Sequence, residues 1–235
     1  MKKIVGFASA ALASIFAMQA APALAQEQAE TQDIWSVDAE LVLVSDYRFR
    51  GLSLSDKDPA VQPGLTITHK SGVYAYFWGS TIAENDGADL ETDVGIGFTR
   101  PLGPVEFDVN ANWYLYPGAR GVSYVEILTS FSAPVGPATV GVEFAYTPPQ
   151  RHTGDMSNRY AAITGELPLG KLPLRLTGSF GIEDGAFADK RRDWSLGLYA
   201  DVAGFEAGAS YIDAAHHGGD PLADPTVVVS LRKSF

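Results

Sequence analysis

The chain of 235 residues contains no cysteine, which excludes disulfides and thiolate metal sites. After the first 25 residues it has no apolar run of 18 or more residues, which excludes a membrane-spanning helix from that part. Basic residues are few: 17 Lys and Arg stand against 28 Asp and Glu, a formal net charge of −11. This balance argues against nucleic acid as a partner.

The first 25 residues have the features of a secretory signal peptide. Lys2 and Lys3 precede an apolar stretch at 4–17, and Ala23-Leu24-Ala25 forms a small-x-small cleavage site. A membrane-anchoring helix is the weaker alternative, because the apolar stretch is shorter than about 20 residues. The sequence therefore predicts a signal peptide at 1–25 and a single mature domain at 26–235.

The mature part is rich in period-two alternation, which is typical of β-strands with two different faces. In residues 105–116, for example, apolar side chains at odd positions alternate with Glu106, Asp108, Asn110 and Asn112. Twelve such segments are predicted, most with about the 9 to 11 residues that a tilted membrane strand needs. They are 37–49, 60–69, 73–82, 90–99, 105–116, 122–132, 138–147, 158–167, 173–183, 193–202, 205–213 and 226–235.

The segments between these strands alternate between short Pro/Gly turns and longer polar loops, such as 84–89 and 183–193. This rhythm predicts an all-β fold: one up-and-down antiparallel transmembrane β-barrel with short turns and both termini on the periplasmic side. Segments 73–82 and 158–167 have a less defined apolar face and could be loops, which would leave ten strands.

Aromatic residues are predicted at both ends of the strands, as in the two interfacial rings of a membrane barrel. The inner ring is Phe98, Phe131, Phe205 and Phe235, and the outer ring is Phe49, Trp113, Tyr146, Trp194 and Tyr211. The terminal Phe235 is also predicted to serve as the signal for membrane assembly. The alternative is a soluble β-sandwich whose aromatic residues fill a core.

Residues 44–80 resemble the opening of the TorF-family porins of proteobacteria, in an SDYxFRG-type phrase and a later D-P-A-x-Q phrase. The matching residues are Ser45, Asp46, Tyr47, Phe49, Arg50, Gly51, Ser53, Asp58, Pro59, Ala60 and Gln62. The resemblance covers about a fifth of the chain. It implies a location in the outer membrane and a pore, and it implies no catalytic residues and no defined substrate.

If the apolar face meets lipid, the opposite face lines the lumen and carries many carboxylates. The predicted pore-lining residues are Asp38, Glu40, Asp46, Arg48, Glu91, Asp93, Glu106, Asp108, Glu126, Glu143, Arg175, Asp201, Glu206 and Arg232. Buried charges need water or partners, so we expect a narrow, water-containing channel that prefers cations. The alternative is a plugged barrel, in which Arg48, Arg175 and Arg232 tie the carboxylates into a static network.

The phrase Tyr47-Arg48-Phe49-Arg50-Gly51 has two interpretations. It could be a strand-end aromatic anchor followed by a loop-starting glycine, which the sequence slightly favours. It could instead fold inward, so that Arg48 and Arg50 form a constriction and Gly51 permits a close approach.

Signals for an enzyme or a cofactor are weak. The adjacent His216 and His217, with Asp213, Asp220 and Asp224 nearby, could chelate a divalent ion, but adjacent histidines in such a loop are more often solvated, so no metal site and no cofactor are predicted. His69 is the only histidine in a predicted strand, at the periplasmic end, so no catalytic residue is predicted. A non-conducting structural or adhesive barrel is the main alternative to a channel, and a lipid hydrolase is less favoured. The expected partners are outer-membrane lipids and lipopolysaccharide, the barrel-assembly machinery, and small hydrophilic solutes or cations.

Overall fold

The computed structural model describes residues 34–170 and 172–235. The predicted signal peptide and the first residues of the predicted mature domain lie outside these ranges. Among the described residues, no helix has the length and apolarity needed to cross a membrane.

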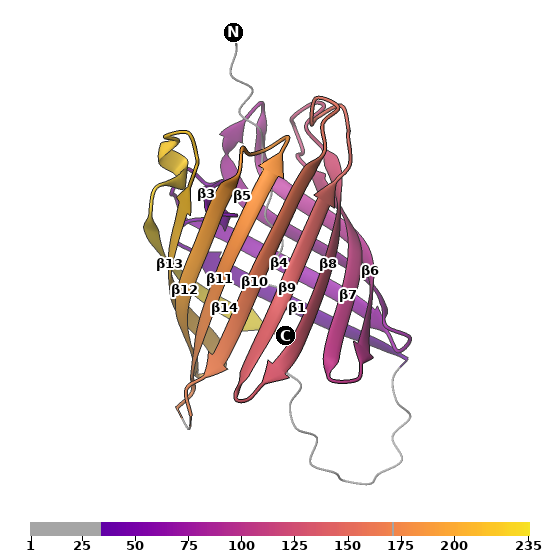
Figure 1. The fold of residues 1–235 in the computed structure, drawn as a ribbon, viewed down its shortest axis with the longest axis vertical. Helices are drawn as coiled ribbons and strands as arrows, with labels where there is room; N and C mark the ends of the chain where they lie inside the picture. Colours follow the sequence, from indigo (N-terminus) through magenta and orange to yellow (C-terminus); the bar gives the residue numbers. More distant parts are fainter. Residues whose placement is uncertain (1–33, 171) are drawn as a thin grey trace.

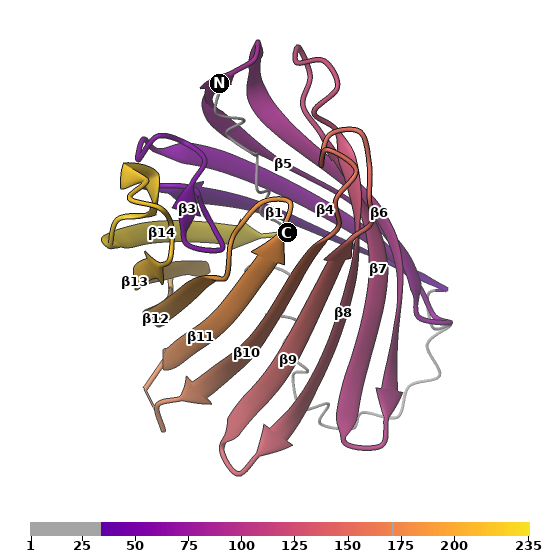
Figure 2. The same cartoon turned by 45° about the horizontal axis from the view of Figure 1, so that its top comes forward.

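Twelve antiparallel strands form one closed barrel, in which each strand pairs with its neighbours along the chain and the first pairs with the last (Figures 1 and 2). They are β1 (Trp35–Val44), β4 (Ala60–His69), β5 (Val73–Asn85), β6 (Ala88–Leu102), β7 (Val105–Leu115), β8 (Tyr124–Val135), β9 (Ala138–Thr147), β10 (Asn158–Pro168), β11 (Leu174–Gly185), β12 (Arg191–Val202), β13 (Phe205–Ala215) and β14 (Thr226–Ser234). The prediction of twelve strands is confirmed, and the ten-strand alternative is wrong. Three short elements are not part of the barrel wall. They are a small hairpin of β2 (Arg48–Phe49) with β3 (Leu52–Ser53), and a 3-10 turn, η1 (Pro221–Ala223).

The apolar face of the strands points out of the barrel. Trp113, Phe144 and Leu198, which a soluble sandwich would bury in a core, are 42%, 50% and 45% exposed. The inward face instead carries buried polar residues such as Glu91, Asn112 and Glu126. The sandwich alternative is therefore wrong, because a closed sheet of alternating sequence places one complete face outside and the other inside.

The connection between β5 and β6 differs from the prediction. Strands β5 and β6 continue through the expected loop at 84–89 and meet in a tight turn at Asp86 and Gly87, which both have positive φ. An Asp-Gly pair is typical of this two-residue hairpin turn, because it tolerates positive φ at both positions. At the other end of the barrel the short predicted turns are present, for example between β12 and β13 at Ala203 and Gly204.

The first strand is shorter than predicted: β1 ends at Val44 rather than continuing to 49. The chain then turns into the lumen, so Phe49 is 4% exposed and is not part of the outer aromatic ring. Trp113, Tyr146 and Tyr211 do lie exposed on the outer surface, as do Phe205 and Phe235 near the opposite end. The rings are therefore as predicted for these five residues, and the placement of Phe49 was wrong.

Tyrosines inside the barrel cover glycines of the neighbouring strand. A Cβ atom added at Gly95 would lie 2.3 Å from the ring of Tyr76, and one added at Gly97 would lie 2.3 Å from the ring of Tyr74. The Tyr76 hydroxyl donates to Asn112 Oδ1 at 2.7 Å, and the Tyr74 hydroxyl donates to Asp108 Oδ1 at 2.8 Å. These tyrosines therefore occupy the part of the lumen next to β5, β6 and β7.

Candidate functional site

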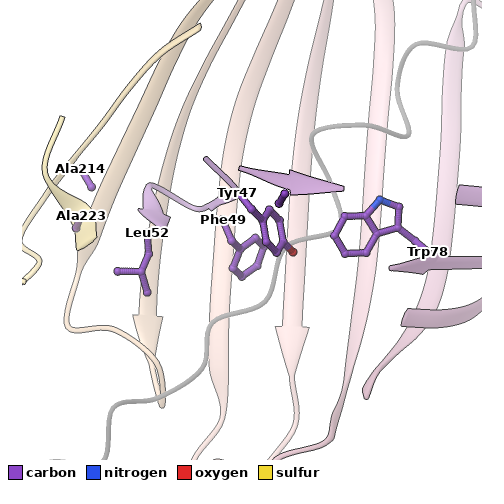
Figure 3. Close-up of a cluster of buried hydrophobic side chains, with 7 residues drawn as sticks. Tyr47, Phe49, Leu52, Trp78, Ala214 and Ala223 are labelled. Carbon is purple, nitrogen blue, oxygen red and sulfur yellow. The ribbon is translucent and has the colours of Figure 1, made fainter. Parts of the chain in front are cut away.

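The segment between β1 and β4, residues 45–59, folds into the barrel; we call it the inserted loop. Tyr47, Phe49 and Leu52 of this loop are buried with Trp78 of β5 and with Ala214 and Ala223 (Figure 3). The rings of Tyr47 and Trp78 lie 5.5 Å apart. The interpretation of this phrase as an anchor at the strand end is therefore wrong, and the inward-folding interpretation is confirmed.

Polar side chains hold the inserted loop in shape. Asp46 accepts hydrogen bonds from Arg48 Nε at 2.6 Å and from Ser53 Oγ at 2.6 Å. Arg48 Nη1 donates to the carbonyl oxygens of Gly51 at 3.0 Å and Asp224 at 2.9 Å. Because Asp46 neutralises Arg48 within the loop, this pair adds no net charge to the lumen.

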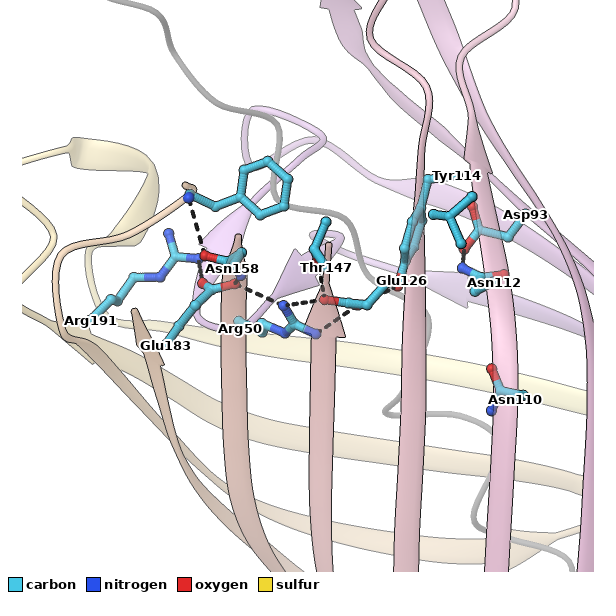
Figure 4. Close-up of polar contacts among 12 residues, drawn as sticks. Arg50, Asp93, Asn110, Asn112, Tyr114, Glu126, Thr147, Asn158, Glu183 and Arg191 are labelled. Atoms are coloured by element: carbon cyan, nitrogen blue, oxygen red, sulfur yellow. Dashed lines mark hydrogen bonds and ion pairs between the residues drawn. The ribbon is translucent and has the colours of Figure 1, made fainter. Parts of the chain in front are cut away.

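Arg50 joins the inserted loop to the opposite wall (Figure 4). Its Nη2 donates to Glu126 Oε2 of β8 at 2.9 Å, and its Nη1 donates to Glu183 Oε1 of β11 at 2.7 Å. Glu183 also pairs with Arg191 at the start of β12. We call these four residues the Arg50 clasp. Charge-assisted hydrogen bonds of this kind are stronger than neutral ones, so the clasp fixes the loop across the lumen.

The two carboxylates of the clasp accept further hydrogen bonds from neighbouring side chains. Glu126 accepts from the Tyr114 hydroxyl at 3.0 Å and from the Thr147 hydroxyl at 2.9 Å, and Glu183 accepts from Asn158 Nδ2 at 2.9 Å. The Arg50 guanidinium also lies 4.3 Å from the centre of the Tyr160 ring. Both carboxylates of the clasp are therefore satisfied by several donors, although Arg50 Nε and Arg191 Nε have no acceptor among the described residues.

Gly51 allows the inserted loop to approach the wall. Its φ is +83°, and a Cβ atom there would lie 2.7 Å from the Cβ of Ala214. We expect Gly51→Ala to destabilise the folded barrel by more than the ~1–2 kcal/mol that left-handed backbone costs an L-residue. Gly103→Ala is the matched control, because Gly103 has φ +67° and a Cβ atom added there would have no non-neighbouring described atom within 4 Å. Equal losses in urea unfolding of the two variants would contradict the close approach.

The predicted pore-lining residues all belong to the inserted loop or to the inward face, but they form separate groups. Glu40, Glu206, Arg175 and Arg232 form a network near the end of the barrel that carries the short turns, with Glu166 as a further partner. Asp38, Glu106 and Asp201 lie exposed at that rim. The remaining carboxylates of the wall are Glu91, Asp93, Asp108, Glu126 and Glu143.

The wall carboxylates differ in their partners. Asp93 accepts from Asn112 Nδ2 at 2.9 Å, and Glu91 lies 3.5 Å from the Tyr47 hydroxyl. Glu143 makes no hydrogen bond or ion pair with any described residue, although it lines the lumen. Ion pairs therefore tie some of the lumen carboxylates to arginines, and Arg50 rather than Arg48 crosses the lumen.

Three residues inside the barrel were not predicted from the sequence to belong to the candidate site: Arg191, Asp193 and Tyr160. Arg191 fell in a predicted loop, because the strand was expected to begin at 193. The alternation that places Ser195 and Asp201 inward also places 191 and 193 inward, so this signal was available. Tyr160 lies in segment 158–167, in which the sequence did not define which face is apolar.

A cavity of about 240 Å³ lies under the inserted loop. The loop residues Arg48 and Arg50 line it, together with wall residues Glu143, Tyr160 and Asp193. It extends toward Glu206 and Arg232, which lie close to the short turn between β12 and β13. The cavity is therefore the part of the lumen between the inserted loop and the end of the barrel that carries the short turns.

The histidines lie outside this cavity. His69 Nδ1 is 2.8 Å from the Ser71 hydroxyl in the turn between β4 and β5. His152, in the loop between β9 and β10, stacks on Tyr124, and burial lowers the pKa of its imidazole. Among the described residues, no group of three or more His, Cys, Asp or Glu side chains is placed to hold a metal ion.

Several solved structures share this architecture, and no curated protein matches the chain. The KdgM porin has a TM-score of 0.55 at 9% identity over 85% of this chain and 98% of its own. The COG4313 outer membrane channel from Pseudomonas putida F1 has a TM-score of 0.53 at 10% identity, over 88% and 100%. The NanC porin has a TM-score of 0.51 at 10% identity, over 85% and 98%. At these identities the likeness shows the fold.

The family is shown by the sequence itself. A profile described as "Bacterial protein of unknown function (Gcw_chp)" matches residues 28–235, which is nearly all of the chain. The match includes every strand of the barrel and the inserted loop. The chain therefore belongs to the Gcw_chp family of bacterial proteins.

Proposed function

We propose that this protein is a narrow channel of the bacterial outer membrane that admits small hydrophilic solutes and prefers cations. The observation that carries the proposal is a closed barrel with an apolar outer face and a charged, partly open lumen. An apolar belt exposed around a closed sheet suits lipid, because the barrel leaves no unpaired strand edge in the bilayer. The resemblance to the TorF-family porins supports the same function.

The proposed partners follow from the same surfaces. The outward face would contact outer-membrane lipids and lipopolysaccharide. Phe235, 76% exposed after β14, would be read by the barrel-assembly machinery during insertion. No enzymatic activity is proposed.

The cation preference rests on the lumen charges. Carboxylates outnumber guanidinium groups on the inward face, and Glu143 and the rim residues Asp38 and Asp201 have no ion pair with a described residue. A lumen with an excess of one charge raises the local concentration of the opposite ion. The inserted loop narrows the path, so only small solutes would pass.

We expect the purified protein to conduct in planar bilayers, with a reversal potential in a KCl gradient that has the sign of cation selectivity. Glu143→Gln is expected to reduce this potential, because it removes an unpaired charge from the lumen. Asp189→Asn removes a charge from an exposed outer loop and is expected to leave the potential unchanged. A reversal potential of the opposite sign would exclude the cation preference.

A second candidate, a non-conducting structural or adhesive barrel, is favoured by one observation. The outer half of the lumen is closely packed: Glu91, Asp93, Tyr114, Glu126 and Glu183 are 0–1% exposed. Function would then rest on the outer loops at 148–157 and 214–225, since much of 50–59 is inside the barrel. Folded, heat-modifiable protein that gives no conductance would favour this candidate over the channel.

A further inference from the structure

Two carboxylates in the cavity under the inserted loop form no ion pair with any residue that the structure describes. Glu143 of β9 and Asp193 of β12 lie in one row of the sheet, separated by Ala162 and Gly181. Both line the cavity, and Asp193 is 6% exposed. Its Oδ1 accepts from the Tyr160 hydroxyl at 3.1 Å, whereas its Oδ2 has no partner among the described residues.

The neighbouring arginines are committed elsewhere. Arg50 acts on Glu143 and Asp193 at longer range, but its ion pairs are with Glu126 and Glu183. Arg191 pairs with Glu183 as well. These six side chains carry two positive and four negative formal charges. A buried group with such an excess is unfavourable without a compensating charge, so a ligand here should bring a positive group.

The same cavity also contains hydrogen-bond donors without acceptors. Arg48 Nη2 and Arg50 Nε are buried and have no partner among the described residues, and both residues line the cavity. A simple cation would compensate the carboxylates and leave these donors unpaired. A neutral polyol could satisfy the hydrogen bonds and would leave the charge. A molecule with both an ammonium and a carboxylate group would meet both requirements.

The size and the aromatic lining fit such a molecule. Small-molecule sites in proteins are commonly about 300–1,000 Å³, so a cavity of about 240 Å³ suits a small ligand. Tyr47, Trp78 and Tyr160 line it, and aromatic faces attract ammonium groups. A metal ion is disfavoured, because no described group of three acidic or histidine side chains converges here.

We propose that this cavity binds a small zwitterion of the α-amino acid type. Its ammonium group would lie toward Asp193 and Glu143, and its carboxylate toward Arg48 and Arg50. This proposal rests on the proposed channel function and adds the class of solute that the lumen would bind.

The test is calorimetric titration of the refolded protein in detergent with L-alanine. We expect saturable binding that weakens about tenfold or more in Asp193→Asn, because a charge-assisted contact is lost. Glu143→Gln should weaken binding in the same direction. Asp201→Asn, on the same strand but at the exposed rim, should bind as the unaltered protein does. Heat-modifiable migration of each variant would establish that it is folded.

Three analogues of L-alanine test whether the ligand needs both charged groups. Propionate lacks the ammonium, ethylammonium lacks the carboxylate, and glycerol is neutral; each should bind about tenfold or more weakly than L-alanine. Absence of saturable L-alanine binding would overturn the proposal, as would equal binding by ethylammonium or glycerol, or by folded Asp193→Asn and Glu143→Gln. Binding without conductance would refute the channel and keep the site, and conductance without binding would do the reverse.

Discussion

Replacing Arg50 by alanine is expected to lower the free energy of unfolding of the barrel by about 3–5 kcal/mol, the usual effect of removing one partner from a buried ion pair. Glu126 and Glu183 would keep their negative charges inside the lumen, and only Glu183 would retain a cationic partner, Arg191. Urea unfolding in detergent, followed by tryptophan fluorescence, would measure the loss. Trp78 packs against Tyr47 of the inserted loop and would report on it.

A matched control exists in the same loop. Lys57 lies 3.9 Å from Asp224, and both side chains are largely exposed. Exposed pairs of this kind contribute about 0–1 kcal/mol, so Lys57→Ala should leave the unfolding midpoint nearly unchanged. Similar losses in the two variants would show that the clasp does not hold the loop.

The same Arg50→Ala change distinguishes a constriction from a static plug. If the clasp holds the inserted loop across a conducting path, the single-channel conductance should rise when the clasp is removed. If the loop stays in place through Tyr47, Phe49 and Leu52, stability should fall without a change in conductance. The second result would show that the apolar contacts of the loop, rather than the clasp, set the width of the path.

A double-mutant cycle would isolate the pairwise contribution of the clasp. Glu126→Gln alone leaves Arg50 with Glu183 as its one carboxylate partner, while Arg50→Ala alone leaves Glu126 with the Tyr114 and Thr147 hydroxyls. Because the two residues share hydrogen bonds, their effects should be non-additive by about 0.5–3 kcal/mol. Additive effects would mean that the two side chains act independently.

The barrel could be predicted from the sequence because its two faces have different surroundings. The outward face is apolar and exposed and the inward face meets polar groups, so the alternation at residues 105–116 is strict. Strands 60–69 and 138–147 have the predicted bounds, since Pro/Gly turns or polar residues mark their ends. The inward position of most charged residues follows from the same alternation.

The inserted loop could not be placed with certainty because its partners are remote in sequence. Arg50 is 76 residues from Glu126 and 133 from Glu183, and no local pattern indicates such contacts. The alternation in 37–49 continues past Val44, so the strand appeared longer than it is. The pairing of Asp46 with Arg48 and Ser53 ends it by giving the chain a stable inward fold.

The outer belt carries the prediction that separates a membrane barrel from a soluble one. Leu198 lies on the outward face of β12, four residues from both Trp194 and Val202, and is 45% exposed. In a bilayer this places it near the middle of the apolar belt. An arginine on the lipid face costs about 2–4 kcal/mol at the midplane and little near the interfaces. We expect Leu198→Arg to lower the free energy of unfolding in phospholipid vesicles by that amount.

Leu172→Arg provides the matched control. Leu172 is 62% exposed in the turn between β10 and β11, outside the strands. The same substitution there should cost about 0–1 kcal/mol, because the new charge stays in water or at the interface. In water alone, two exposed leucines would respond alike, since surface substitutions rarely exceed about 0.5 kcal/mol. Equal effects in vesicles would therefore place the belt outside the hydrocarbon, and the channel proposal would lose its physical basis.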